Sequence, residues 1–190
     1  MLEDAELVEL AKAGDQEALQ ALFRRYQNRI FSYLFRMLGR KEEAEDAAQE
    51  TFINAFRTVK RYKEEGRFHS WLFTIAHREG LRMLRKRKRA PLSVSQFEDQ
   101  RCLDLPDPAP LPSQRVMEKQ ELEHLEYALR KLSDSEREVV ILRLVDDVPF
   151  KEVAEITGAP LNTVLGRMHN ATKKLRKILE RDRVSDEKRS

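Results

Sequence analysis

One stretch of the chain combines aromatic, small polar and basic residues in a pattern that suits contact with a nucleic acid. Residues 68–89 read FHSWLFTIAHREGLRMLRKRKR; they include the only tryptophan, Trp71, and end in five consecutive cations, Arg85 to Arg89. Aromatic rings can stack on bases that have left a duplex, while cations bind the neighbouring phosphates. Apolar residues at helical spacing more often build a core, and we favour the core for Trp71 itself.

A second stretch, residues 150–177, has the pattern of a helix-turn-helix. Gly158 permits a tight turn, and Pro160 suits the start of the next helix. With the apolar side chains facing inward, a helix slim enough for a major groove would present Asn162, Thr163, Arg167, and His169 or Asn170. The cations that follow are placed for phosphate contact: Lys173, Lys174, Arg176 and Lys177. A plain helical hairpin with a solvated basic face is the alternative for this segment alone.

The charges of the chain are segregated, although its net charge is only +3. Residues 60–89 hold eleven Lys or Arg against three Glu, and residues 167–181 hold six against one Glu. Residues 91–126, between them, hold three cations against eight acidic residues. Two basic segments separated by an acidic one favour two contacts with one long polyanion.

Helices with one apolar face must position these segments. Apolar residues recur at spacings of three and four from residue 19 to 38, which predicts a long helix that Asp15 caps and Gly39 ends. Further helices are predicted over residues 2–13 and 42–59, and another begins near His69 or Ser70. Periodicity resumes in the last third of the chain, where a capping box is formed by Ser133 and Glu136.

The helical pattern collapses between residues 91 and 113. Five prolines in this stretch remove backbone donors and fix φ, so that it forms neither a regular helix nor a central strand. We therefore predict an all-α protein with two small helical domains joined by a proline-rich acidic linker. Its parts are a first domain over 1–90, a flexible linker over 91–113, a helix-turn-helix domain over 114–182 and a disordered tail over 183–190.

Several classes of function find no support in the residues. Cys102 is the only cysteine, and the four histidines lack ligand spacing, so we expect no internal disulfide, no metal site and no cofactor. The sequence shows no Ser, His and Asp arrangement and no glycine-rich phosphate loop, so we expect no enzyme. The amino terminus is acidic and no apolar run approaches the roughly 20 residues of a membrane span, which predicts a cytoplasmic protein.

Four stretches, taken in order, resemble extracytoplasmic-function sigma factors, the small two-domain class of the sigma-70 family of bacterial transcription initiation factors. They are ELVELAKAGDQEALQALFRRYQNRIFSYLFRMLG, AEDAAQETFINAFRTV, FHSWLFTIAHREGLRMLRKRKR and LSDSEREVVILRLVDDVPFKEVAEITGAPLNTV. The resemblance spans the chain from Asp4 to Lys177. It implies a protein that binds core RNA polymerase and directs promoter-specific initiation, by binding the −35 element as duplex and by recognising and melting the −10 element.

The resemblance also assigns three surfaces to residues of this chain. Docking on the polymerase largest subunit would use Asp46, Gln49, Glu50, Phe52, Ile53 and Phe56. The −10 strand would be contacted by Tyr62, Lys63, Phe68, His69, Ser70, Arg78, Arg82 and Arg85. The −35 element would be read by the helix-turn-helix, Phe150 to His169, and by the helix that continues from it, through Asn162, Thr163, Arg167, Asn170, Lys173 and Lys174.

The chain departs from the family pattern at a few of these positions. Members usually have Asn where this chain has Arg78, and Lys, Ser and Arg where it has Leu165, Gly166 and Asn170. We expect weaker phosphate contact at the −35 element as a result, offset by the basic segment that begins at Lys173.

The implied partners are core RNA polymerase, promoter DNA and an anti-sigma factor, with no small-molecule substrate and no membrane insertion. The alternative function is a free-standing helix-turn-helix regulator that binds operator duplex. The helix over 46–59 and the aromatic and basic segment after it favour the sigma factor, because an operator-binding regulator needs neither.

Overall fold

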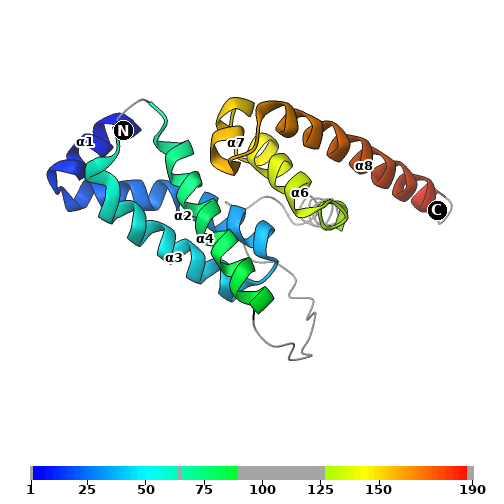
Figure 1. The fold of residues 1–190 in the computed structure, drawn as a ribbon, viewed down its shortest axis with the longest axis horizontal. Coiled ribbons are helices and arrows are strands. Elements are labelled where there is room, and N and C mark those ends of the chain that lie inside the picture. The colour runs from blue at the N-terminus through cyan, green and yellow to red at the C-terminus, as the bar shows by residue number, and fades with distance from the viewer. Residues whose placement is uncertain (1, 64–65, 90–126, 188–190) are drawn as a thin grey trace.

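The computed structural model describes residues 2–63, 66–89 and 127–187, and every regular element in these ranges is a helix (Figure 1). The predicted all-α class and the two helical domains are confirmed. The predicted linker over 91–113 lies outside the described residues.

The first domain contains α1 (Asp4–Ala13), α2 (Gln16–Leu38), α3 (Lys41–Thr58), the 3-10 turn η1 (Val59–Arg61) and α4 (Phe68–Arg89). In the second domain, residues 127–130 are helical and are followed by α6 (Asp134–Val140), the π-helical η2 (Ile141–Val145), α7 (Phe150–Thr157) and α8 (Leu161–Glu187). Helix α8 therefore continues past residue 182, where we predict the second domain to end and a disordered tail to begin.

The predicted start and stop signals of the helices are confirmed. The Asp15 carboxylate accepts hydrogen bonds from the backbone N–H groups of Glu17 and Ala18, at 2.8 and 3.1 Å, and so caps α2. Gly39 ends the same helix with a φ of 72°, in the left-handed region that glycine adopts readily. Ser133 and Glu136 form the reciprocal capping box at the start of α6.

Helices α2 and α4 approach closely at a glycine in the middle of α4. A Cβ atom at Gly80 would lie 2.5 Å from Met37 Sδ and 3.2 Å from Leu34 Cδ2. The lack of a side chain at this position therefore allows α2 and α4 to pack closely. Through this packing α2 holds α4 and the basic segment at its end.

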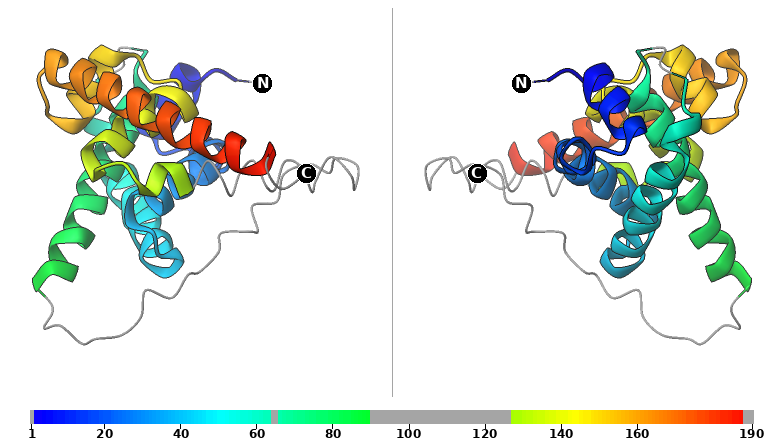
Figure 2. Two further views of the ribbon diagram at one scale, coloured as in Figure 1. Left: turned by 90° about the vertical axis from the view of Figure 1, so that its right-hand side faces the viewer. Right: turned by 90° about the vertical axis from the view of Figure 1, so that its left-hand side faces the viewer.

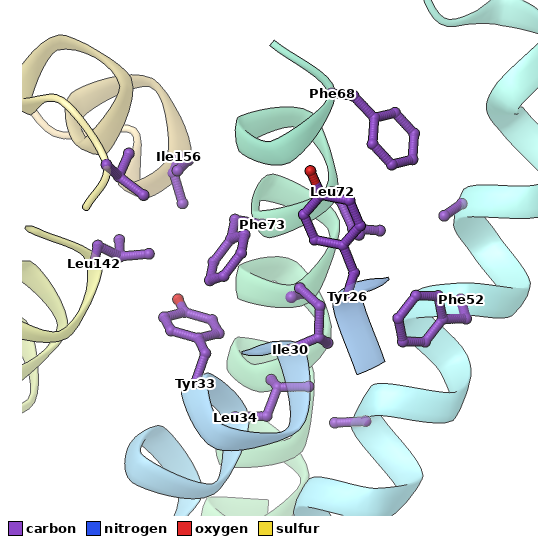
Figure 3. Packing of buried hydrophobic residues seen from close by; sticks show 14 of the residues in the cluster. Tyr26, Ile30, Tyr33, Leu34, Phe52, Phe68, Leu72, Phe73, Leu142 and Ile156 are labelled. Carbon is purple, nitrogen blue, oxygen red and sulfur yellow. The ribbon is translucent and has the colours of Figure 1, made fainter. Parts of the chain in front are cut away.

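The apolar core of the first domain continues into the second. Figure 3 shows Tyr33 of α2 and Phe73 of α4 lying toward Leu142 of η2 and Ile156 of α7. All four side chains are at most 3% exposed and belong to one cluster of buried residues. The two domains therefore pack against each other through an apolar centre.

The views in Figure 2 show which surfaces this packing leaves open. Helices α6, α7 and α8 lie on one side of the first domain, and the last turns of α4 project away from them. Contacts between the domains run mainly from α4 to α7 and from α2 to α6 and η2. The basic end of α4 therefore lies outside the interface, while the start of α4 lies within it.

Candidate nucleic-acid and polymerase interfaces

A small open pocket of about 230 Å³ lies beside the first turns of α4. Tyr62 and Trp71 supply aromatic walls, and their ring centroids are 4.9 Å apart. The remaining lining comes from Lys63, Arg67, Ser70, Thr74 and Glu155. Two aromatic rings beside two cations make a site of the kind on which an unpaired base stacks while its phosphates are neutralised.

Phe68 is buried, although we predict it near the −10 strand, and Trp71, which we favour for the core, packs against the core and also lines the pocket. Phe68 is only 4% exposed and packs against Tyr26 and Tyr62, whereas Trp71 is half-buried at the pocket wall. The helical period explains the difference, because residue 68 shares the buried face of α4 with Leu72 and Ala76, four and eight positions later. This spacing of residues 68, 72 and 76 is visible in the sequence and could have predicted the burial of Phe68. Phe68 therefore supports the pocket from below, and Trp71 forms its surface.

His69 and Ser70, which we predict near the −10 strand, take different places: His69 packs between aromatic rings, and Ser70 lines the pocket and contacts α7. The His69 ring is half-buried between Tyr26 and Phe73, with centroid distances of 6.0 and 4.5 Å. Ser70 is 5% exposed, and its hydroxyl donates a hydrogen bond to Glu152 of α7. Of this predicted pair, only Ser70 reaches the pocket.

The outer face of α4 carries a cationic stripe, which we define as Arg78, Arg82, Arg85 and Arg89. These residues follow at spacings of four, three and four, so they share one face, and all are exposed. Arg82 Nε donates to Glu79 at 2.6 Å, and Asn54 of α3 holds the same carboxylate at 3.0 Å. The stripe thus follows one face of α4 away from Trp71 and presents exposed positive charge along the helix.

Helix α3 presents the residues predicted to dock on polymerase along one face. Asp46 and Gln49 are exposed, and Glu50 and Ile53 are half-buried on the same side. Phe52 differs from the prediction, because it is 5% exposed and its ring packs on Phe23 at 4.8 Å. Phe52 therefore supports this face from within, next to the half-buried Phe56.

The helix-turn-helix has the predicted geometry. Gly158 joins α7 to α8 with a φ of 66°, and Val153, Ile156 and Val164 are at most 3% exposed in the angle between the helices. The first turns of α8 expose most of the residues predicted to read DNA, although Arg167 is half-buried. The exposed residues of these turns are Asn162, Thr163, Leu165, Gly166, His169, Asn170 and Lys173. These residues form the outward face of a helix of the size that enters a major groove.

Lys174 has a protein partner, whereas the neighbouring Lys173, which we also predict to bind phosphate, makes no ion pair or side-chain hydrogen bond among the described residues. Its Nζ donates to Glu136 Oε2 at 2.8 Å, and this contact is the main cause that lowers the pKa of Glu136. Glu136 is also the acceptor of the capping box of α6. Lys174 therefore ties α8 to α6.

We expect Lys173→Ala and Lys174→Ala to have different effects. Lys173→Ala will weaken DNA binding and leave stability unchanged, because Lys173 is exposed. Lys174→Ala will lower the free energy of unfolding by about 0.2–1 kcal/mol, because it removes a half-exposed ion pair. Urea unfolding and DNA titration of each variant will show the division. Equal loss of DNA binding in both, with no change in stability, would contradict it.

Five polar contacts surround the apolar centre of the domain interface, and the sequence gives no local signal for any of them. Tyr33 Oη donates to Glu138 Oε1 at 2.6 Å, and His77 Nδ1 lies 2.5 Å from the same oxygen. The remaining three contacts join Arg29 to Asp146, Ser70 to Glu152 and Arg67 to Glu155. The partners are 61 to 117 residues apart in the chain, so only the tertiary fold brings them together.

Burial shifts the pKa values of two groups on either side of Arg29 in opposite directions. Burial, helped by the charge of Arg29, lowers the pKa of His69 from 6.5 to about 4. Burial raises the pKa of Asp146 from 3.8 to about 6, although Arg29 opposes this shift. Within the described part of the chain, neither His69 Nε2 nor Asp146 Oδ2 has a hydrogen-bond partner.

These two shifts predict opposing effects of pH on stability. The stability that neutral His69 contributes is complete above pH 6.5 and is lost as the pH falls toward 4, because the unfolded chain takes up the proton first. Asp146 acts in reverse, because the folded chain takes up its proton near pH 6 and gains stability as the pH falls toward 3.8. Each pKa shift changes the free energy of unfolding by on the order of 3 kcal/mol, and because the two changes have opposite signs they largely cancel in the natural chain.

We therefore expect single substitutions to uncover each effect between pH 7 and pH 4.5. Asp146→Asn will lose stability on acidification more steeply than the natural chain, and His69→Gln will lose less or gain. Urea unfolding at the two pH values measures the difference, with His169→Gln, at an exposed histidine, as the control. Identical pH dependence in all three variants would refute the assignment.

The described residues offer no sign of a metal site or of a membrane span. Across 2–63, 66–89 and 127–187, no three His, Cys, Asp or Glu side chains come together in a way that could hold a metal ion. In the same ranges, no helix combines the length and the apolar character that crossing a membrane requires.

The fold and its surfaces define a class of DNA-binding protein in which a helical domain with an aromatic pocket and a cationic helix is joined to a helix-turn-helix domain. Comparison with known proteins agrees with this division. Residues 22–90 match the model of Sigma-70 region 2, and residues 128–177 match that of Sigma-70, region 4. The chain belongs to the sigma-70 family, within its extracytoplasmic-function (ECF) RNA polymerase sigma factors.

Individual relatives match over nearly their whole length. The chain is 30% identical over 176 residues to the ECF RNA polymerase sigma factor SigW of Bacillus subtilis, covering 90% of this chain and 94% of that protein. It is 30% identical to the RNA polymerase sigma factor YlaC of the same organism, covering 90% and 97%. This family consists of transcription initiation factors rather than classical enzymes.

Two solved structures share the arrangement of the chain. The structure of CnrH in complex with the cytosolic domain of CnrY is 25% identical, with a TM-score of 0.65, and covers 94% of this chain and 98% of that one. The sigma factor RpoE of Bartonella quintana, crystallised with the anti-sigma factor NepR, has a TM-score of 0.67, is 23% identical and covers 85% and 96%. The second likeness supports the fold alone.

Proposed function

We propose that the chain binds core RNA polymerase and directs promoter-specific transcription initiation. One observation carries this proposal: the models of Sigma-70 region 2 and region 4 match the first and the second domain in that order. Each of these domains exposes a surface suited to DNA. The chain performs no chemistry of its own in this function, because it acts by binding polymerase and opening DNA. Acting with polymerase places it in the bacterial cytoplasm.

Polymerase docking falls to the exposed face of α3. Asp46, Gln49, Glu50 and Ile53 share this face, so that acidic, amide and apolar groups are presented together. The buried Phe52 and half-buried Phe56 keep the helix in place against α2. Asp46→Arg should then prevent co-purification with core polymerase, whereas Glu17→Arg on α2, also at an exposed acidic residue, should not.

Promoter contact is divided between the domains. In the first domain, Tyr62, Lys63 and Trp71 receive an unpaired base of the −10 element, and the cationic stripe follows the backbone of its strand. In the second domain, the exposed face of α8 reads the −35 element as duplex. Trapping an unpaired base offsets part of the roughly 1.4 kcal/mol per step that separates stacked bases.

An anti-sigma factor is the proposed regulatory partner. One similar protein of known structure, RpoE of Bartonella quintana, was solved in complex with the anti-sigma factor NepR. The free-standing operator-binding regulator is not favoured, because the matches to both sigma-70 regions include the α3 surface and the pocket that such a regulator does not need.

Run-off transcription with purified core polymerase on genomic fragments tests the function. We expect defined transcripts only when the chain is present, with start sites that share upstream sequence elements. If the chain neither co-purifies with core polymerase nor yields transcripts, the proposal is refuted and the alternative function, an operator-binding regulator, is favoured instead.

A further inference from the structure

We propose that Leu161 and Leu165 read thymines of the −35 element, by packing on the C5-methyl groups that thymine presents in the major groove. The inference deepens the proposed function and rests on it, because it assigns a base preference to the face of α8 that reads duplex DNA. It predicts that the chain selects A·T base pairs where the first turns of α8 meet the groove.

The two leucines are exposed apolar residues in the part of the helix where bases are read. Leu161 is 37% exposed and Leu165 is 42% exposed, and because four positions separate them they share one face of α8. In a helix-turn-helix, the N-terminal residues of the second helix contact the base edges. Leu161 is the first residue of that helix, within the segment that matches Sigma-70, region 4. The two side chains therefore form an apolar part of the DNA-reading face.

The charges along α8 separate base contact from phosphate contact. All exposed residues from Leu161 to Gly166 are uncharged, and Arg167, the only Lys or Arg of α8 before Lys173, is half-buried. Four cations follow between Lys173 and Lys177. Cations bind phosphates whatever the sequence, whereas an uncharged face gains its affinity from the bases. The first turns of α8 therefore suit the floor of the groove, and the later turns suit the phosphates.

Gly166 provides a second observation, because nothing in the described residues accounts for a glycine at this position. A Cβ atom at Gly166 would meet no atom within 4 Å, and the backbone is helical, so neither packing nor conformation requires glycine. Gly80 differs, since a Cβ atom there would collide with Met37. A glycine in a helix interior is destabilising, but it lets the backbone approach a ligand closely. Gly166 would thus bring the short side chain of Leu165 down to the bases.

A protein partner is the competing occupant of this apolar surface. Leu161 and Leu165 line an open hollow of about 600 Å³ together with Pro149 and Phe150 at the start of α7. Charged residues of both signs complete the lining of this hollow. The place of both leucines at the start of the DNA-reading helix favours bases, and only a base contact responds to the loss of a methyl group from DNA.

Removal of single methyl groups from DNA tests the proposal. The chain, bound to core polymerase, selects duplexes from a random-sequence pool, and core polymerase alone gives the background. Each thymine of the enriched sequence is then replaced in turn by deoxyuridine, which lacks only the C5-methyl group and pairs in the same way. Affinity for each duplex is measured with the natural chain, with Leu161→Ala and with Leu165→Ala.

We expect loss of the methyl group from at least one thymine to weaken binding of the natural chain about fourfold, which corresponds to exposing one buried methyl group. Leu165→Ala will bind the thymine duplex as weakly as the natural chain binds the uracil duplex, and will no longer distinguish the two. Leu179→Ala, at an exposed leucine farther along α8, will keep the ratio of the natural chain. Equal affinity of the natural chain for both duplexes at every thymine overturns the proposal, as does an enriched sequence without thymine.

Two further outcomes also decide against the proposal. If Leu161→Ala and Leu165→Ala lower affinity by the same factor for thymine and uracil duplexes, the leucines contact protein or support the fold instead of reading a methyl group. If the selection enriches no sequence, the first turns of α8 do not read bases. Run-off transcription on genomic fragments needs no selection, and it then shows whether the proposed function fails as well.

Gly166→Ala gives a result that a folding defect cannot imitate. Because alanine favours a helix over glycine, we expect this variant to unfold at the same urea concentration as the natural chain or at a higher one. The added methyl group will hold the helix away from the groove, so the ratio of affinities for thymine and uracil duplexes will fall toward one. An unchanged ratio would contradict the close approach on which the reading by Leu165 depends.

Discussion

Replacing Arg78, Arg85 and Arg89 by Gln will weaken binding to single-stranded DNA by about 50-fold at 0.15 M salt. Each cation on the exposed face of α4 is placed to neutralise one phosphate, and each contact to a single strand contributes about 0.7 to the slope of log K against log salt. Losing three contacts lowers that slope by about two. If the two proteins bind equally well near 1 M salt, this smaller slope gives the stated difference in affinity at 0.15 M salt. Arg82 is left in place because Glu79 already binds it.

The matched control removes three cations elsewhere. Arg24→Gln, Lys41→Gln and Lys131→Gln change the net charge equally, at exposed positions off the stripe, and should alter the slope by much less than one. Fluorescence anisotropy at several salt concentrations gives both slopes. An unchanged slope in the stripe variant would show that the cations of α4 form only a solvated face.

Phe73→Ala will lower the free energy of unfolding by about 3–5 kcal/mol. The ring is fully buried, and it packs against Tyr33 and His69 with centroid distances of 5.3 and 4.5 Å, so its removal leaves a cavity that α2 and α4 cannot fill. Phe31→Ala is the control, because Phe31 is half-buried and its ring stacks only on Phe35 among the aromatic residues in the described ranges.

Urea unfolding followed by circular dichroism measures both variants. We expect the Phe31 variant to lose less than half of what the Phe73 variant loses. A loss below about 1 kcal/mol for Phe73→Ala would mean that the first domain tolerates a cavity at its border with the second, contrary to the close packing of interiors.

The helix signals that the sequence predicts correctly are local ones. Asp15 caps α2 and Ser133 caps α6, because a cap needs only a side-chain oxygen within three residues of the N–H that it accepts. The helix-turn-helix is predicted correctly for the same reason, because Gly158 and the apolar residues around it lie within one short segment.

The predictions that the structure corrects concern which side of a helix faces the core. The spacing of Phe68 with Leu72 and Ala76 indicates its buried face, but the sequence does not show which neighbours cover the aromatic residues of α3 and α4. Phe52 proves to be buried by Phe23 from α2, and Phe68 by Tyr26 from the same helix. The interface between the domains was beyond prediction, because Glu138 meets His77 only after both domains are folded.

The apolar centre shared by the two domains gives their association a characteristic response to temperature. Separating the domains would expose the rings of Tyr33 and Phe73 together with Leu142 and Ile156, all of which are buried in the packed form. Hydration of apolar surface raises the heat capacity, so apolar association weakens on cooling. The packed form should therefore loosen in the cold and tighten on moderate warming, until heat begins to unfold the helices themselves.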